Sequence, residues 1–277
     1  MTQALPAISV QHETLAERVK HFLEERIVAC SHDAYNALDW EKEATEISNP
    51  TLHYPEYYLA PHHGFIEGYL SNAQALGWAF VERFFRVHRV LPAFLRIASA
   101  VEPHSIVDLG CGVATASLEL AKLFPNAQLT LLDLSPYQLA VARRRAQQAE
   151  LAQRTTYVHA SAEDTGLPSA STNLVMSTLL FHELPRPQAH MVAEEAYRLL
   201  IPGGRFVDFD PIQRVVSWRS VDRTINTLLA KLIHEVYWLE YMSQPVWEVC
   251  RDAGFQQVER KLLVAFPWVY QVVIATK

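Results

Sequence analysis

The sequence predicts an α/β fold with a mostly parallel sheet, preceded by a region made only of helices. From Pro103 onward, short apolar runs alternate with helical stretches, which is typical of strand–helix–strand units. Before about residue 100 no run reads as a strand. The last two apolar runs follow each other without a helix between them, and this order predicts a terminal antiparallel hairpin.

The predicted sheet has seven strands, and the first five of them are parallel. These five runs cover 105–110, 128–134, 156–160, 173–177 and 205–209. Helical stretches are expected at 114–124, 136–149, 188–200 and 245–253. The hairpin strands are expected at 257–266 and 269–276, and a Pro-Gly-Gly turn at 202–204 should precede the fifth strand.

The first hundred residues are predicted to form a helical cap or lid. An amphipathic helix is expected at 12–29 and a long helical region at 72–100, where Pro92 should end or kink the helix. Between them lies an aromatic segment interrupted by prolines, at 53–69. We therefore expect a cap over 1–100 and a core over 101–277, with a helical insert at about 212–243.

The composition excludes several classes of partner. The net charge is −6 and no basic cluster could follow a nucleic-acid backbone. No run of 18 apolar residues predicts a membrane span. The three cysteines are scattered and the histidines lack chelating spacings, so we predict no disulfide framework and no metal. This composition favours a protein of the reducing cytoplasm.

The first predicted strand turns into a helix through a glycine pair, and this turn predicts a cofactor site. Gly110 and Gly112 let a ligand approach the backbone closely, and Asp133, which ends the next strand, can accept hydrogen bonds from ribose hydroxyls. A dinucleotide would need a third glycine where Thr115 stands. Asp108 favours a cationic ligand instead, so S-adenosylmethionine (SAM) fits better.

The segment 107–115 resembles motif I of the class I SAM-dependent methyltransferases, D/E-x-G-x-G-x-G, with Ala114 at the last glycine. The segments 131–135, 161–168, 181–185 and 198–205 resemble that family's ribose loop, adenine loop, pocket floor and L-x-P-G-G turn. The resemblance implies a Rossmann-like fold and SAM as cofactor. The cofactor-binding residues that we infer are Asp108, Gly110, Cys111, Gly112, Asp133, Leu134, Ala162, Glu163, Asp164 and Thr178.

Catalytic side chains are harder to choose, because methyl transfer needs positioning more than a particular base. The candidates are Tyr57, Tyr58, His62, His182 and Asp210. Packing is an equal alternative for the two tyrosines, and a structural hydrogen bond is an alternative for His182. Tyr237 and Tyr241 could form a further wall of the site or belong to the core.

The leading function is transfer of a methyl group from SAM to a small molecule. A second hypothesis makes SAM itself the substrate of a cyclase or lyase, for example one that forms azetidine-2-carboxylate and releases methylthioadenosine. A third is a SAM-binding protein without catalysis. Methylation of macromolecules is disfavoured, because no basic surface and no N-P-P-Y-type motif follows the fourth strand.

Overall fold

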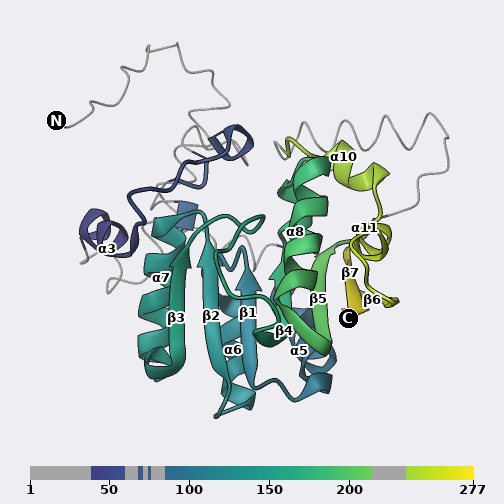
Figure 1. Cartoon of the computed structure of the whole chain (residues 1–277), viewed down its shortest axis with the longest axis horizontal. Helices are drawn as coiled ribbons and strands as arrows, with labels where there is room; N and C mark the ends of the chain where they lie inside the picture. The colour runs from purple at the N-terminus through teal and green to yellow at the C-terminus, as the bar shows by residue number, and fades with distance from the viewer. Residues whose placement is uncertain (1–38, 60–67, 71–73, 76–84, 214–234) are drawn as a thin grey trace.

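The computed structural model describes residues 39–59, 68–70, 74–75, 85–213 and 235–277, and it contains a seven-stranded sheet of order β3-β2-β1-β4-β5-β7-β6 (Figure 1). The strands are β1 (Ser105–Leu109), β2 (Gln128–Asp133), β3 (Thr155–His159), β4 (Thr172–Thr178), β5 (Leu200–Pro211), β6 (Gln257–Ala265) and β7 (Trp268–Thr276). Strands β1 to β5 pair in parallel, and β7 runs antiparallel to both β5 and β6. The predicted parallel sheet and terminal hairpin are confirmed.

Helices cover both faces of this sheet. The longer ones are α3 (Trp40–Ile47), α5 (Val87–Ala98), α6 (Thr115–Leu123), α7 (Pro136–Gln148), α8 (Arg186–Leu199), α10 (Trp238–Ser243) and α11 (Val246–Asp252). The short 3-10 turns are η1 (Glu56–Leu59), η2 (Ser99–Val101), η3 (Ala152–Arg154) and η4 (Phe181–Glu183).

Neighbouring strand residues point to opposite faces, so each strand serves two cores. Ile106 of β1 packs in the cluster that contains α5, α6 and α7, whereas Val107 packs in the cluster that contains α8 and α11. Strands buried on both faces read as continuous apolar runs, which explains why they were visible in the sequence.

Two details of the predicted elements are wrong. The Pro-Gly-Gly segment does not precede β5 but lies inside it: the β4–β5 pairing shifts between Thr172 and Leu174, and Gly203 takes a φ of 78° at this irregularity. The helical region 72–100 is not one helix, because Arg86 has a left-handed φ of 57° and α5 begins only at Val87. Pro92 does not end α5, which continues to Ala98.

The N-terminal region packs on the β3 side of the sheet through α3 (Figure 1). Arg143 of α7 pairs with Glu43 at 2.6 Å, and the hydroxyl of Tyr137 donates to Glu41 at 2.9 Å. The predicted helix 12–29 and most of the insert lie outside the described residues, so the domain boundaries stay predictions. Within the part of the chain that the structure describes, no helix combines the length and apolar character needed to cross a membrane.

Candidate functional site

A cavity opens at the carboxyl ends of β1, β2 and β4, where parallel sheets of this kind bind ligands. Its walls come from the glycine loop, the loops after β2 and β3, the turn after β4, and the tyrosine-rich N-terminal segment. The lining residues are Tyr57, Tyr58, Tyr69, Asp108, Gly110, Cys111, Gly112, Thr115, Ala116, Leu132, Asp133, Leu134, Gln138, Ala162, Glu163, Thr178, Leu179, Leu180, Glu183 and Leu184.

The glycine loop curls through three left-handed residues. Gly110, Gly112 and Ala114 have φ values of 64°, 52° and 59°. A Cβ on Gly110 would lie 2.8 Å from a methyl carbon of Leu180, so this backbone is in close contact with the turn after β4. Ala114 keeps the backbone conformation that glycine usually supplies in the motif, and the departure from the motif leaves the loop geometry intact.

Asp133 ties two loops together at the end of β2. One carboxylate oxygen accepts from the backbone N–H of Gly112 at 2.7 Å and the other from that of Ser135 at 2.8 Å. Burial raises the pKa of this carboxyl group to about 6. The side chain therefore shapes the glycine loop while it lines the cavity.

Four buried oxygens of cavity-lining residues have no hydrogen-bond partner among the described residues. They are Oδ1 of Asp108, Oγ1 of Thr178, the hydroxyl of Tyr58 and Oε1 of Gln138. Burial, with the nearby charge of Asp133, raises the pKa of Asp108 to about 7. An unpaired buried acceptor is costly unless a ligand satisfies it, so these atoms fit a ligand that carries an ammonium group and hydroxyls, as SAM does.

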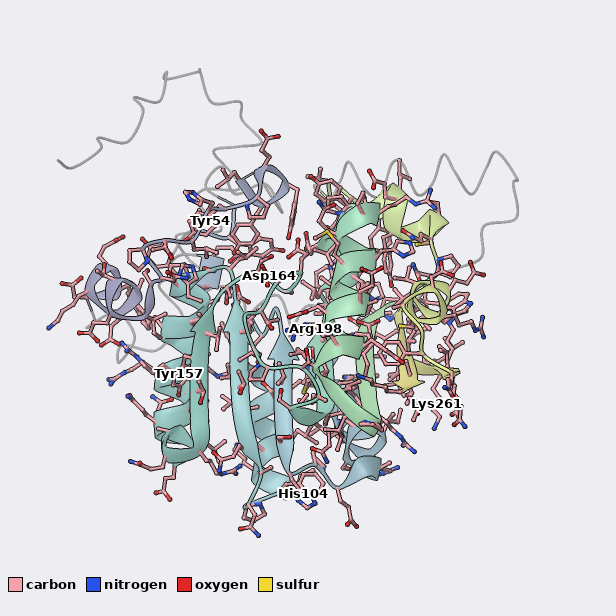
Figure 2. All side chains as sticks on the ribbon, viewed as in Figure 1. Tyr54, His104, Tyr157, Asp164, Arg198 and Lys261 are labelled. Atoms are coloured by element: carbon pink, nitrogen blue, oxygen red, sulfur yellow. The ribbon has the colours of Figure 1, made fainter. Side chains whose placement is uncertain are left out.

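The loop after β3 forms the next wall. Ala162 and Glu163 line the cavity, and Glu163 accepts a hydrogen bond from the Tyr57 hydroxyl at 2.5 Å. The side chain of Asp164 is exposed and does not line the cavity. It nevertheless lies at the end of the sheet where the cavity opens, whereas His104 lies at the other end (Figure 2). Its contact with adenine stays a prediction.

Three tyrosines stack above the cavity. Tyr58 lies between Tyr54 and Tyr69, with ring centroids 6.0 Å and 5.8 Å apart. Tyr57, Tyr58 and Tyr69 all line the cavity, and Tyr57 also packs edge-on against Tyr237. The sequence left packing and a place in the site as alternatives for Tyr57 and Tyr58. Both side chains pack against other rings and also line the cavity. His62 lies outside the described residues.

His159, which sequence reasoning did not single out, fastens the tyrosine segment to the sheet. Its Nδ1 accepts from the backbone N–H of Asn49 at 2.8 Å, so Nε2 carries the proton and donates to the carbonyl of Leu134 at 2.9 Å. The Tyr54 hydroxyl lies 3.2 Å from the same Nε2. Burial lowers the pKa of His159 below 6.5. The only signal in the sequence was its position at the carboxyl end of a strand.

We expect this attachment to weaken in acid. Between the lowered pKa of the folded state and 6.5, the unfolded chain binds more protons, so the contribution of His159 is complete above pH 6.5 and is lost as the pH falls through the folded-state pKa. Replacing His159 by Gln should lower the unfolding free energy at pH 8 by about 1 to 3 kcal/mol and flatten its dependence on pH. Urea unfolding at pH 8 and pH 5 measures this free energy. If it changes with pH by the same amount in the wild type and in the variant, the prediction is contradicted.

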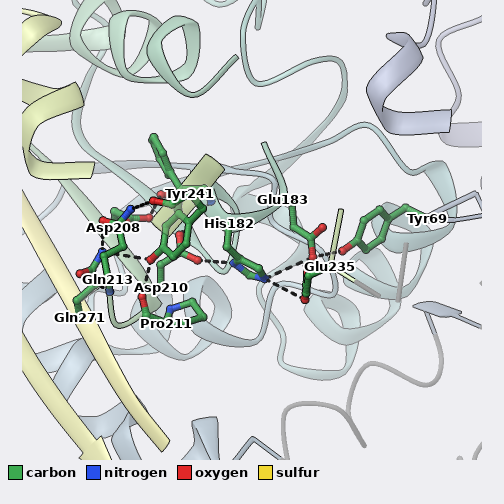
Figure 3. Close-up of polar contacts among 12 residues, drawn as sticks. Tyr69, His182, Glu183, Asp208, Asp210, Pro211, Gln213, Glu235, Tyr241 and Gln271 are labelled. Atoms are coloured by element: carbon green, nitrogen blue, oxygen red, sulfur yellow. Dashed lines mark hydrogen bonds and ion pairs between the residues drawn. The ribbon is translucent and has the colours of Figure 1, made fainter. Parts of the chain in front are cut away.

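A buried polar cluster lies behind the floor of the cavity (Figure 3). His182 Nδ1 contacts Asp210 at 2.5 Å, and Tyr69 donates to Glu183 at 2.7 Å. Burial alone would lower the pKa of His182, but the nearby carboxylates, Asp210 first, raise it well above its usual value. Glu183 lines the cavity, whereas His182 and Asp210 do not. Glu183 therefore reaches the cavity, whereas its neighbour His182, the candidate from the sequence, does not.

The rest of this cluster is structural. Asp208 accepts from Ser177 at 2.8 Å, and burial followed by the charge of Asp210 raises its pKa well above its usual value. Tyr241 is 4 % exposed and donates to the carbonyl of Pro211. Tyr241 thus belongs to the core, the second of the two readings that the sequence left open.

Comparison with known proteins supports the same conclusion. Residues 106–204 match the family described as a methyltransferase domain. The chain is 28% identical over 170 residues to a demethylmenaquinone methyltransferase of Listeria welshimeri, covering 56% of this chain and 71% of the relative.

Two solved structures share the fold. One is an O-methyltransferase family protein from Burkholderia thailandensis, with a TM-score of 0.57 and 16% identity, covering 75% of this chain and 60% of that one. The other is a Haemonchus contortus phosphoethanolamine N-methyltransferase with S-adenosylhomocysteine, with a TM-score of 0.51 and 17% identity, covering 67% and 52%. With the motif order and the strand order, these findings show a methyltransferase domain of the class I SAM-dependent type in this chain.

Proposed function

We propose that this enzyme methylates a small acceptor with an aromatic or apolar body and one polar group, and that Glu183 holds that group. The observation that carries the proposal is the continuity of one cavity. The glycine loop and Asp133 line it, and so do Glu183 and Tyr69. Bound SAM supplies a methyl group activated by its sulfonium.

The cavity residues that would hold each part of SAM are assigned from the chemical groups of the cofactor. Asp108 would hold the ammonium group, Asp133 the ribose hydroxyls, and Ala162 with Glu163 the adenine. Gly110, Cys111, Gly112, Leu134 and Thr178 complete the surface around the cofactor. The Cys111 thiol has a pKa raised well above its usual value by burial, which suits a small wall residue and not a nucleophile.

The acceptor end is mostly apolar. Tyr58 and Tyr69 provide aromatic surface, and Leu180 and Leu184 provide aliphatic surface. A flat ring fits such walls, and the relative from Listeria, by its name, methylates demethylmenaquinone. Glu183 is the carboxylate at this end, and Tyr69 fixes its orientation by a 2.7 Å hydrogen bond. It can orient an acceptor hydroxyl and take up its proton.

Replacing Glu183 by Gln tests this assignment. A panel of hydroquinones and other phenols, incubated with methyl-labelled SAM, identifies an accepted substrate. For that substrate the variant should lose about 10²- to 10⁴-fold in kcat, while its affinity for SAM stays unchanged. The control is Glu194→Gln, an exposed carboxylate on α8. Full turnover in the Glu183 variant, or an equal loss in the Glu194 variant, would refute the role of Glu183.

A further inference from the structure

Two neighbouring side chains and a third from a distant part of the sequence present metal-ligating atoms to one another in the buried polar cluster behind the floor of the cavity. His182 and Glu183 belong to η4, and Glu235 precedes α10. Their exposed fractions are 5, 8 and 8 %. One donor atom from each lies within 4.8 Å of the other two. We propose that His182, Glu183 and Glu235 bind one divalent transition-metal ion.

The separations are those of ligands around an ion. His182 Nε2 lies 3.4 Å from Oε1 of Glu183 and 3.9 Å from Oε1 of Glu235. An N–H···O hydrogen bond spans about 2.7 to 3.2 Å, so both contacts are too long for a good one. Two ligand atoms bound to one ion at about 2.0 to 2.2 Å lie roughly 3 to 4 Å apart. The two ion pairs therefore have the spacing that ligands of one ion would have.

The imidazole is already oriented for coordination. Its Nδ1 is held by Asp210 at 2.5 Å, and the edges of the Trp238 and Tyr241 rings confine it, with centroids at 6.3 and 6.1 Å. A carboxylate on one ring nitrogen directs the lone pair of the other nitrogen outward, as in many histidine–metal sites. Here that second nitrogen points at two carboxylates (Figure 3). A divalent cation bound there would take the place of the proton on that nitrogen and pair with both carboxylates.

The donor set indicates the kind of ion. One imidazole nitrogen with two carboxylates suits Zn²⁺, Mn²⁺ or Fe²⁺ better than Ca²⁺, which prefers a full shell of oxygens. Three protein ligands leave further coordination positions open. Because Glu183 lines the cavity, an open position can face the acceptor. Histidine spacing in the sequence predicts no metal, and a metal bound by this triad would revise that prediction. The spacing could not indicate the triad, because its residues form no local sequence signature.

Metal binding can be measured without SAM or an acceptor, so its outcome is separate from that of methyl transfer. The full chain is freed of metal with a chelator, dialysed, and titrated with Zn²⁺ by calorimetry and with Mn²⁺ by electron paramagnetic resonance. We expect one equivalent per chain. Glu235→Gln should weaken binding by about tenfold or more, and Asp210→Asn by about 10- to 100-fold.

The matched control is Glu248→Gln, which changes an exposed carboxylate on α11. It should bind both ions as the wild type does. Circular dichroism and thermal melts of the metal-free proteins show whether each variant is folded. If the wild type takes up no stoichiometric ion, or if Glu235→Gln binds as tightly as the wild type because surface histidines hold the metal, the triad is not a metal site.

Discussion

Replacing Asp133 by Ala should raise the dissociation constant for S-adenosylhomocysteine about 100-fold and lower the unfolding free energy by several kcal/mol. The side chain accepts hydrogen bonds from the N–H groups of Gly112 and Ser135, and each such bond to a charged group contributes about 1.5 to 3 kcal/mol. Its loss leaves two backbone donors without their partner and frees the loop that contacts the cofactor. Calorimetry and urea unfolding measure the two effects.

The control for Asp133 is Asp164→Ala, because Asp164 is exposed. That variant should keep its stability within about 0.5 kcal/mol. It also tests the adenine contact that the sequence predicts, since a lower affinity at unchanged stability would support that contact. If Asp133→Ala binds as tightly as the wild type, Asp133 does not hold the ribose.

Replacing Gly110 by Ala should lower cofactor affinity by about tenfold and stability by about 1 to 2 kcal/mol. The backbone there has a φ of 64°, and the new methyl group would lie 2.8 Å from Leu180, a residue that lines the cavity. Leu180 must therefore move, and with it the wall of the cavity.

Two other glycines separate the backbone effect from the steric one. Gly112→Ala places a methyl group 3.8 Å from the nearest atom at a φ of 52°, so it should lose a similar amount of stability without displacing Leu180. Gly203→Ala, at a φ of 78° and with no atom within 4 Å, should destabilise the protein and leave binding unchanged. If Gly110→Ala binds no more weakly than Gly203→Ala, the close approach of Gly110 to Leu180 does not matter for the cofactor.

The core of the fold could be predicted because its strands are buried on both faces. Apolar runs such as 128–134 have no polar face that would hide a strand in the sequence. Gly254, with a φ of 104°, follows the end of α11. The start of β5 could not be predicted. Gly203 and Gly204 favour a turn locally, but their backbone hydrogen bonds with Lys277, the residue after β7, hold them beside the sheet. Arg86 likewise adopts its left-handed backbone without a local signal.

The cofactor side of the site could be predicted from contiguous motifs, since Asp108, the glycines and Asp133 all line one cavity. The acceptor side could not. Tyr69 meets Glu183 across 114 residues of chain, and Glu235 approaches His182 from within the predicted insert. Such contacts depend on how the N-terminal segment and α10 pack over the sheet, and no spacing in the sequence records that packing. The emphasis on His182 came from its place in a motif. Its catalytic role stays a prediction, and we propose the neighbouring Glu183 because that side chain lines the cavity.

The measurement that tests the central claim most directly is the identity of the thioether that the enzyme makes from SAM. The purified chain is incubated with SAM alone and with the hydroquinone panel, and the products are separated by mass spectrometry. Methyl transfer predicts S-adenosylhomocysteine, formed only when an acceptor is present, together with one methylated acceptor. Methylthioadenosine formed from SAM alone would contradict this account, because it would show cleavage on the aminocarboxypropyl side with SAM as the sole substrate.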